Sequence, residues 1–334
     1  MLIRLIDDLR QEEHIKSYIT QQSMKALSVQ EHTLREDKVI ASSYIDMLDT
    51  LTTRSDLALI AQTSLGDIVG YALLTEHKNT WVGSVEGFIY ALGIEQYLLD
   101  SPYILEFLDA IRNWGTRHEY SLIRLEVGED TQFQALIDHL QTYGYVTSGL
   151  VPCKILSASK VREGAVSSYI TEDIQIRAGE EEDYPFVVQL LTEAVWAGLS
   201  VFEKTQVSME MLLENIRQEY EVAFRDGSSW CYIAETVDKT FCGHATVMLH
   251  IHPVLDIIEA ELVDTFVLSA FNGHSISGKL TTQALMTCMS QGISFVRGFL
   301  GSENASQEHV QRIRLYLEHN GWWMNSRMMY LRLA

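Results

Sequence analysis

The sequence repeats its order of structural signals in its second half, and this repeat restricts the fold more than any other feature. Leu27 and Leu199 each open a Leu-Ser-Val triplet. Gly144 and Gly321 each stand between a helical pattern and an aromatic residue. The spacing within each pair is slightly more than half of the chain and is nearly the same for both pairs. A spacing that stays this constant predicts two copies of one fold.

Each copy is expected to contain a strand, two helices, a strand meander, a helix, a strand, a helix and a final strand. Apolar periodicity predicts strands of the first copy at residues 2–6, 57–62, 68–74, 81–92, 121–127 and 145–156, and helices at residues 9–25, 37–51, 103–114 and 133–143. Residues 157–173 are polar, contain Ser and Gly, and lack periodicity, as expected of a linker. The predicted domains are therefore residues 1–156 and 174–334.

Composition limits the classes of function. The chain has 334 residues, of which 47% are hydrophobic, enough for two globular domains with separate cores. A formal net charge of −20 at pH 7 argues against nucleic acid as a partner, because phosphates need a basic surface. No apolar run approaches the roughly 20 residues that span a bilayer, so no membrane partner is expected. The N-terminal segment lacks the form of a signal peptide, which favours a cytoplasmic protein.

Cysteines and histidines show no disulfide or metal pattern. The four cysteines have no CxxC spacing and are expected to be buried, reduced thiols. His250 and His252 share one face of a strand, but no third ligand has a recognisable spacing, so no metal is predicted. A homodimer is compatible with the sequence but is not required by it.

Residues 257–280 contain a strand, a turn of small residues and a helix in direct succession. The strand is an apolar run with charged residues at alternate places, and the turn extends over residues 272–278. The helix is expected to bury Ile276, Leu280, Ala284, Leu285 and Cys288. A helix N-terminus carries unpaired N–H groups and partial positive charge, and small residues let an anion approach the main chain. This stretch therefore predicts a phosphate-bearing ligand at residues 272–278.

The stretch resembles the acyl-CoA-binding motif of the GNAT acetyltransferase superfamily. In that motif a strand is followed by a loop of the form Arg/Gln-x-x-Gly-x-Gly/Ala, which opens a helix that holds the CoA diphosphate. Here Asn272 stands at the Arg/Gln position, and Ser275 and Ser277 stand at the two glycine positions. The expected order of elements in both copies is also that of a GNAT domain. The resemblance implies an α/β fold with a mixed sheet (α+β), two tandem GNAT-like acyl-CoA N-acyltransferase domains, and acetyl-CoA as the acyl donor.

The first copy departs further from the motif. Its corresponding segment, residues 93–102, has bulky Tyr and Leu in place of small residues and carries Glu95 and Asp100 where a phosphate would lie. A carboxylate without a compensating charge repels a phosphate. The first copy is therefore interpreted as a degenerate, structural GNAT-like domain. Glu86, which takes the place in the first copy that Glu259 takes in the second, is interpreted as a remnant of its site.

Chemistry is expected in the second copy. Strict alternation would put one set of residues on a single face of its strand: Glu259, Glu261, Val263, Thr265 and Val267. A bulge would shift this alternation. An ammonium group with a pKa near roughly 10.4 must lose a proton before it can attack a thioester. The resemblance implies a glutamate base six positions before Val267, which is Glu261, with Glu259 as the second candidate and Asp264 as the third.

The resemblance also implies an oxyanion donor, an acid and further cofactor contacts. A backbone N–H near Val267 or Leu268 would stabilise the oxyanion. The tyrosine acid of the family would fall at Leu317, so Tyr316, one place earlier, is the candidate acid. Asn304 would contact the pantetheine arm or cap the last helix. The positions implied to bind the cofactor are Val267, Leu268, Asn272, Gly273, His274, Ser275, Ile276, Ser277 and Asn304.

The sequence thus predicts an acetyl-CoA-dependent N-acetyltransferase that acts on a primary amine of a small molecule or peptide. Trp196, Phe202 and Glu203 follow the first helix of the second copy, where the family recognises its acceptor. They are candidates for an acceptor pocket, a lid or a contact with the first copy. A succinyl-CoA or longer acyl-CoA donor stays open. The alternative class is a non-catalytic CoA-binding sensor or a structural pseudo-acetyltransferase.

Overall fold

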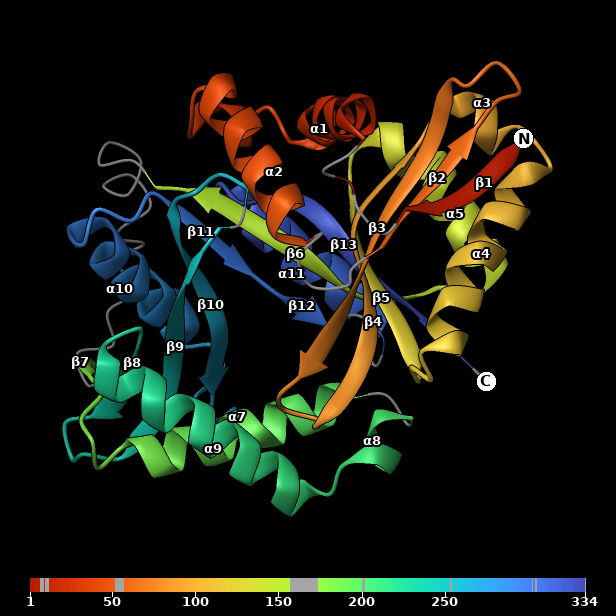
Figure 1. Cartoon of the computed structure of the whole chain (residues 1–334). Helices are drawn as coiled ribbons and strands as arrows, with labels where there is room; N and C mark the ends of the chain where they lie inside the picture. Colours follow the sequence, from red (N-terminus) through yellow and green to blue (C-terminus); the bar gives the residue numbers. More distant parts are fainter. Residues whose placement is uncertain are drawn as a thin grey trace.

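The computed structural model describes residues 1–6, 9, 12–51, 57–156, 174–199, 202–252, 254–301, 303 and 305–333. The predicted linker, residues 157–173, and the candidate cofactor contact Asn304 lie outside the described residues. Figure 1 shows the chain with its helices and strands labelled.

The first half contains six strands and its helices in the order that the sequence predicts. The described elements are β1 (Leu2–Ile6), α1 (Glu13–Ala26), η2 (Glu31–Thr33), α2 (Asp37–Leu51), β2 (Leu57–Gln62), β3 (Ile68–Asn79), β4 (Ser84–Ile94), α3 (Gln96–Leu99), α4 (Tyr103–Arg117), β5 (Leu122–Gly128), η4 (Thr131–Phe133), α5 (Gln134–Tyr143) and β6 (Val146–Ile155). The helix α5 ends at Gly144, whose φ of +113° is left-handed, as expected for a glycine in this position.

The second half repeats this order. Its described elements are β7 (Ile174–Ala178), α7 (Tyr184–Gly198), α8 (Glu203–Gln206), α9 (Met209–Asp226), β8 (Ser229–Thr236), β9 (Phe241–Ile251), β10 (Ile258–Val267), η5 (Ser269–Phe271), α10 (Ile276–Ser290), β11 (Phe295–Gly298), β12 (Leu300–Gly301), α11 (Gln307–His319) and β13 (Trp323–Arg332). Strands β1 to β6 correspond to β7 to β11 and β13, and α1, α2, α4 and α5 correspond to α7, α9, α10 and α11. The predicted mixed α/β class and the tandem repeat are confirmed.

The thirteen strands of the described chain form one mixed sheet in which the two halves exchange their last strands. The order is β1-β2-β3-β4-β5-β13-β6-β11-β10-β9-β8-β7, with β12 beside β6. Strand β13 lies antiparallel between β5 and β6, and β6 lies antiparallel beside β11 (Figure 1). Met329 of β13 is fully buried in the core of the first half. Each half therefore takes its final strand from the other, whereas the domain boundary at residues 157–173 stays a prediction.

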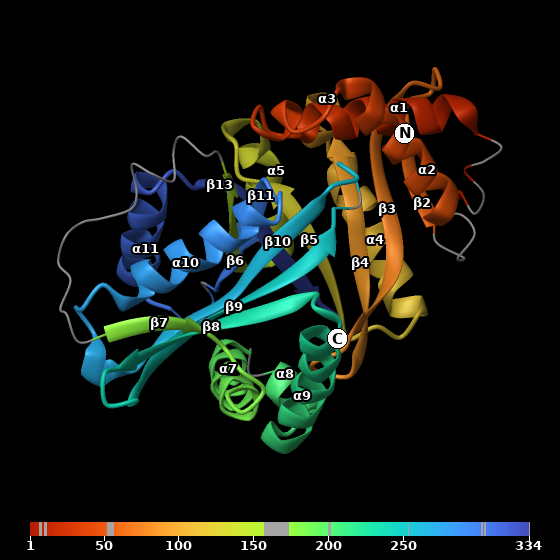
Figure 2. The same ribbon diagram turned by 90° about the vertical axis from the view of Figure 1, so that its left-hand side faces the viewer.

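Helices cover both faces of this sheet. In the first half α4 and α5 pack on one face, and α1 and α2 pack on the other. In the second half α10 packs on one face of β8 to β10, and α7 and α9 pack on the opposite face (Figure 2). The buried residues of α10 are those that its apolar spacing predicts: Ile276, Leu280, Ala284, Leu285 and Cys288.

Two parallel strands separate toward their C-terminal ends in each half. Strands β4 and β5 pair only over residues 87–89 of β4, and β10 and β11 pair only over residues 259–262 of β10. A β-bulge follows in each half, at Tyr90 and at Val263, which hold equivalent places in the two copies. Beyond the bulge, β4 and β10 run on without a parallel partner among the described strands. Both halves therefore have a gap between two parallel strands at the same place in the fold.

The strand exchange predicts that cutting the chain between its halves will not release two folded proteins. A protease site inserted within residues 157–173 and cleaved after purification should leave both fragments in one complex. The reason is that β13 pairs with both β5 and β6 over residues 326–330. Size-exclusion chromatography in native buffer should give a single peak that contains both fragments. Two separate, folded monomers would show that this account of the exchange is wrong.

Candidate active site

The predicted phosphate loop is an open turn that leads into α10. Gly273 has φ +86° and Ser275 has φ +55°, so the chain passes through two left-handed residues before Ile276 begins the helix. That conformation costs a serine about 1 kcal/mol, a strain that is common at functional turns. No side chain among the described residues caps the helix, and residues 272–275 and 277 are exposed. The N–H groups of the first turn are therefore accessible to an anion.

The corresponding segment of the first half is filled. Residues 96–99 form the short helix α3, in which Leu98 and Leu99 are buried. Glu95, the residue before this helix, accepts a hydrogen bond from the Tyr18 hydroxyl at 2.7 Å. Apolar side chains and a carboxylate thus occupy the region where the second half has an open turn, and this segment offers no site for a diphosphate.

The bulge at Val263 reverses the alternation of β10. Val267 packs into the core beneath α10, whereas Asp264 contacts His244 on the face toward α7 and α9, with 3.0 Å between Oδ2 and Nε2. The prediction that Thr265 and Val267 share the face of the two glutamates is therefore wrong. One extra residue moves every later side chain of the strand to the opposite face.

The two candidate oxyanion amides differ in their partners. The N–H of Leu268 donates to the carbonyl of Cys242 at 2.9 Å, so this amide is already engaged. Val267 is opposite Gly243 in the next pair of the antiparallel ladder. Because hydrogen-bonded and non-hydrogen-bonded pairs alternate, the N–H of Val267 points away from β9, toward the gap between β10 and β11. Of the two amides, only that of Val267 faces this gap.

Glu261 forms an ion pair with His250 of the neighbouring strand β9. The distance between Oε2 and Nε2 is 3.1 Å, and the Glu261 side chain is 34% exposed. Burial raises the pKa of Glu261, but the hydrogen bond from His250 and the positive charge of Arg297 outweigh it and bring this pKa below its usual value. The same hydrogen bond raises the pKa of His250. Glu261 is therefore an accessible, ionised carboxylate at neutral pH.

Glu259 is a buried carboxyl group with an incomplete set of contacts. It is 4% exposed, its Oε1 lies 3.9 Å from Nη1 of Arg297, and its Oε2 has no hydrogen-bond partner in the described chain. Burial raises the pKa of Glu259 to about 7, and the nearby charges of Arg297 and His250 oppose this rise only in part. Glu259 can therefore exchange a proton near neutral pH.

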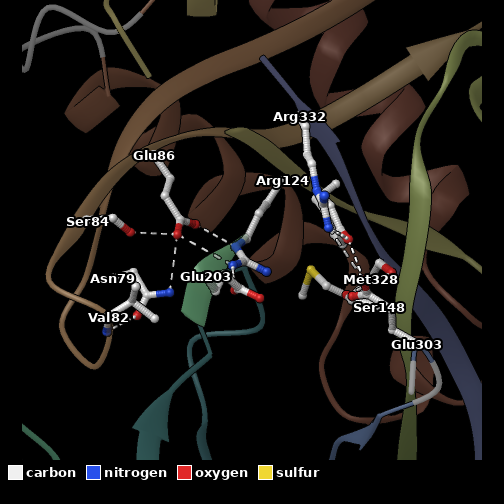
Figure 3. A network of polar contacts seen from close by, with 11 residues as sticks. Asn79, Val82, Ser84, Glu86, Arg124, Ser148, Glu203, Glu303, Met328 and Arg332 are labelled. Atoms are coloured by element: carbon white, nitrogen blue, oxygen red, sulfur yellow. Dashed lines mark hydrogen bonds and ion pairs between the residues drawn. The ribbon is translucent and has the colours of Figure 1, made fainter. Parts of the chain in front are cut away.

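Glu86, the counterpart of Glu259 in the first half, has partners on both oxygens. Its Oε1 accepts from Ser84 at 2.9 Å and from Asn79 at 3.3 Å, and its Oε2 accepts from Arg124 at 2.5 Å (Figure 3). Arg124 also donates to Glu203 of α8 at 2.6 Å. The first half thus satisfies the carboxylate that the second half leaves partly unsatisfied, as expected for a structural ion pair.

Two polar residues that the sequence reasoning missed lie on the same side of the second half. His244 is fully buried, and in the described chain its Nδ1 has no hydrogen-bond partner. Tyr220 of α9 is also fully buried with an unpartnered hydroxyl, and burial, followed by the charge of Glu261, raises its pKa. An unpaired buried polar group costs about 1–3 kcal/mol, so His244 and Tyr220 are added to the candidate polar residues on this face of the second half. The one available sequence signal was a histidine inside the mostly apolar run at residues 241–249.

Tyr316, the candidate acid, lies on α11 and is 53% exposed. Its hydroxyl is 3.2 Å from the point where a side chain on Gly278 would begin. Gly278 belongs to the first turn of α10, so the hydroxyl lies beside the predicted phosphate loop. Among the candidate acceptor residues, Glu203 contacts the first half through Arg124, and Phe202 lies under the guanidinium of Arg332 of β13.

The described residues contain no group of three His, Cys, Asp or Glu side chains that could hold a metal ion. All four cysteines are buried and none forms a disulfide. Among the helices of the described chain, none is both long and apolar enough to cross a membrane.

The chain matches known proteins in structure, but no match is found from its sequence. Neither protein-family models nor curated protein sequences match the chain. A GCN5-related N-acetyltransferase from Sphaerobacter thermophilus matches with a TM-score of 0.51 at 10% identity, over 83% of this chain and 80% of that chain. The glucosamine N-acetyltransferase region of a fungal multi-domain GH3 beta-N-acetylglucosaminidase matches with a TM-score of 0.50 at 11% identity, over 99% of this chain and 38% of that chain.

A tandem GNAT protein from the clavulanic acid biosynthesis pathway is similar over 90% of this chain and 97% of that chain, at 11% identity and a TM-score of 0.48. At these identities a structural likeness shows the fold and not the activity. The two matches with TM-scores of 0.51 and 0.50 show that the chain has the fold of the GNAT N-acetyltransferases, and the repeated order of elements shows that the chain contains this fold twice.

Proposed function

We propose that this protein is an acyl-CoA-dependent N-acyltransferase, with acetyl-CoA as the donor and a primary amine of a small molecule or peptide as the acceptor. The proposal places the chemistry in the second half. One observation carries it: strand β10, which borders the gap to β11, leads directly into the open turn at residues 272–275. In the first half the gap is present, but the short helix α3 occupies the place of the turn.

The residues proposed to bind acetyl-CoA have the chemistry that a thioester with a diphosphate needs. The uncapped first turn of α10 would bind the diphosphate through backbone N–H groups, and the exposed residues 272–275 would let it approach. The N–H of Val267, directed into the gap, would stabilise the oxygen of the thioester carbonyl as negative charge develops on it. His274 and Ser277 would add side-chain contacts at the rim of the turn.

Glu261 is the proposed general base. It is ionised at neutral pH and a third of its side chain is exposed, whereas Glu259 is almost fully buried. Glu261, directly or through a water molecule, would take a proton from the ammonium group of the acceptor. The free amine would then form a C–N bond with the thioester carbonyl carbon, and the nitrogen would lose its second proton to solvent. The C–S bond would break, and the thiolate would receive a proton from Tyr316 or from solvent.

A non-catalytic CoA-binding sensor is the second candidate. It is favoured by the position of Tyr316, whose hydroxyl lies beside Gly278 in the first turn of α10. Under this alternative, Tyr316 would contact the diphosphate, and acetyl-CoA would bind without turnover. The two candidates differ in a panel of primary amines: acetylation of any of them excludes the sensor.

Acetyl-CoA is expected to bind once per chain. Isothermal titration calorimetry should give a stoichiometry of one, and a ligand concentration of 100 Kd should stabilise the fold by about 2.7 kcal/mol. Ser275→Trp should abolish binding, because a large side chain would cover the open turn. Ser290→Trp, an exposed serine at the other end of α10, is the matched control and should bind normally. Retained affinity in the Ser275 variant would mean that the loop is placed wrongly, and a stoichiometry of two would restore the first half as a CoA site.

Glu261→Gln is expected to lower kcat by about 10²-fold or more while the Kd for acetyl-CoA stays unchanged. The amide keeps the shape of the side chain but cannot accept the proton. Stopped assays of thiol release with the best acceptor of the amine panel measure the rate. An unchanged kcat would remove Glu261 from the mechanism.

Glu259 should make the stability of the protein depend on pH. Its pKa rises from 4.5 to about 7 on folding, so the folded state binds more protons than the unfolded state between these values. The resulting stabilisation is complete below about pH 4.5 and is lost as the pH rises through 7, by at most about 3 kcal/mol. Glu259→Gln removes this dependence. Urea unfolding should show that the variant gains stability relative to the wild type between pH 5 and pH 8, and a difference that does not change with pH would contradict the assignment.

A further inference from the structure

A short segment between α7 and α9, residues 202–207, connects the proposed acyl-transfer site with the first half. It contains α8 and ends at Val207. Val207 is buried in the apolar cluster that contains Met248 of β9 and packs against Val263 of β10. Met248 is opposite Glu261 in the ladder, and Val263 follows Glu261 by two residues. The C-terminal end of the segment is therefore anchored in the core that flanks the proposed general base.

Two guanidinium groups on the strands of the first sheet hold the other end of this segment. Nη2 of Arg124, on β5, donates to Oε1 of Glu203 at 2.6 Å, and Glu203 is only 8% exposed (Figure 3). The guanidinium carbon of Arg332 lies 5.7 Å from the centroid of the Phe202 ring. Arg332 is on β13, which pairs with β5. The segment thus extends from the core beside Glu261 to the opposite half of the molecule.

Glu86 fixes the direction in which Arg124 points. Glu86 is 1% exposed, and its two oxygens accept from Nε of Arg124 at 2.5 Å and from Nη2 at 3.4 Å. Because a guanidinium is planar and its donors have a fixed geometry, binding on this edge sets its orientation. The same Nη2 donates to Glu203. Glu86, which belongs to the half without an open phosphate turn, therefore acts on the second half through Arg124.

The first half contains an equivalent contact in the reverse direction. Glu31 and Glu203 follow Leu27 and Leu199 by the same four residues, so they hold equivalent places in the two copies. Glu31 is 5% exposed, and its Oε1 accepts from Nδ2 of Asn325 of β13 at 3.2 Å. In each half a buried glutamate after the first helix is thus bonded to a residue of the other half. This repetition favours a role of the contact in the tandem arrangement.

The hairpin of β3 and β4 adds a second contact between the halves at the same place. Val82, at its tip, is buried in the apolar cluster that contains Val207. Nε1 of Trp81 donates to Glu219 of α9 at 2.9 Å, and Nδ2 of Asn215 donates to the carbonyl of Trp81 at 2.9 Å. The hairpin therefore fixes β4, which carries Glu86, relative to α9 of the second half.

We propose that Arg124 of the first half is a positioning residue for the second half. It holds Glu203, and with it residues 202–207, in one conformation, and the held segment sets the access of the acceptor to Glu261. The first half thus contributes to acyl transfer without binding CoA. The inference rests on the proposed function where it concerns the acceptor, whereas the position of the segment and the exposure of Glu261 can be measured without turnover.

The first test uses the full chain without CoA or acceptor. Glu203→Ala removes the contact and leaves Arg124 paired with Glu86, and Glu31→Ala is the matched control at the equivalent place in the first half. Hydrogen–deuterium exchange of a peptide covering residues 202–207 should be about tenfold faster in Glu203→Ala, because the segment is released locally. Labelling of Glu261 by a water-soluble carbodiimide should increase at least threefold. Both readings should stay at the wild-type level in the control.

Unchanged exchange of residues 202–207 in Glu203→Ala would overturn the proposal, and so would unchanged labelling of Glu261. Faster exchange throughout the chain would also overturn it, because the contact would then support the whole fold rather than one segment. Thermal unfolding of the variant and of the control separates these two cases.

The second test uses acetyl-CoA and the best acceptor of the amine panel. Glu203→Ala should raise the KM for the acceptor about tenfold, because a loosened segment must be ordered again when the acceptor binds. Its kcat and its Kd for acetyl-CoA should change less than twofold. Arg124→Lys, which keeps the positive charge, should raise KM less than Glu203→Ala does. A lower kcat with an unchanged KM would overturn the role in acceptor access.

The two proposals fail in different ways. If no amine is acetylated, the acyltransferase proposal and the role in acceptor access fail together, but exchange and labelling still decide whether Arg124 positions the segment. If amines are acetylated and Glu203→Ala behaves as the wild type does in all measurements, the acyltransferase proposal stands and the positioning role is excluded.

Discussion

The backbone ladder that joins β5, β13, β6 and β11 is the interaction on which the rest of this structure depends. Strand β13 pairs with β5 over residues 326–332 and with β6 over residues 323–330, so its central residues 326–330 are paired on both sides. A half without its borrowed strand would expose the edge of β5 or of β11, and an exposed edge invites pairing with other chains. The exchange covers both edges at once, and it brings β11 of the second half close to the first half. The position of Arg297, between Glu126 of the first half and Glu259 of the second, follows from this arrangement.

Duplicated positions in the two halves have taken on different electrostatic roles. Glu86 and Glu259 hold equivalent places in the two copies, as do Arg124 and Arg297. In the first half Glu86 and Arg124 are in contact at 2.5 Å and the glutamate has further partners, which makes a closed ion pair. In the second half the corresponding distance is 3.9 Å and one oxygen is left without a partner in the described chain. A buried carboxyl group without full pairing has a raised pKa, and such groups occur at functional sites more often than in structural cores.

Structural features that depend on residues close together in the chain could be predicted from the sequence. The apolar spacing from Ile276 to Cys288 gave the helix α10 and its buried face, and the small residues before it gave the exposed turn, because both depend on residues close in the chain. The alternation after Val263 was predicted wrongly, since a bulge depends on the partner strand and has no local mark in a single sequence. The exchange of β6 and β13 could not be predicted either, because it also depends on which strands pair. His244 and Tyr220 were missed because a buried polar residue in an apolar pattern shows its significance only once its neighbours are known.

Arg297 connects the two halves through charge. Its guanidinium lies 3.2 Å from Glu126 of the first half and 3.9 Å from Glu259, two residues before Glu261. Glu126 shares this guanidinium with Glu259, and the negative charge of Glu126 is one of the causes that raise the pKa of Glu259. Neutralising Glu126 would leave Arg297 to pair more closely with Glu259, and a closer guanidinium favours the ionised form of a carboxyl group. A residue of the first half is therefore coupled to the two glutamates of the second half, by an interaction that grows as the surroundings exclude water. The coupling requires no movement of the backbone, because one side chain already contacts both halves.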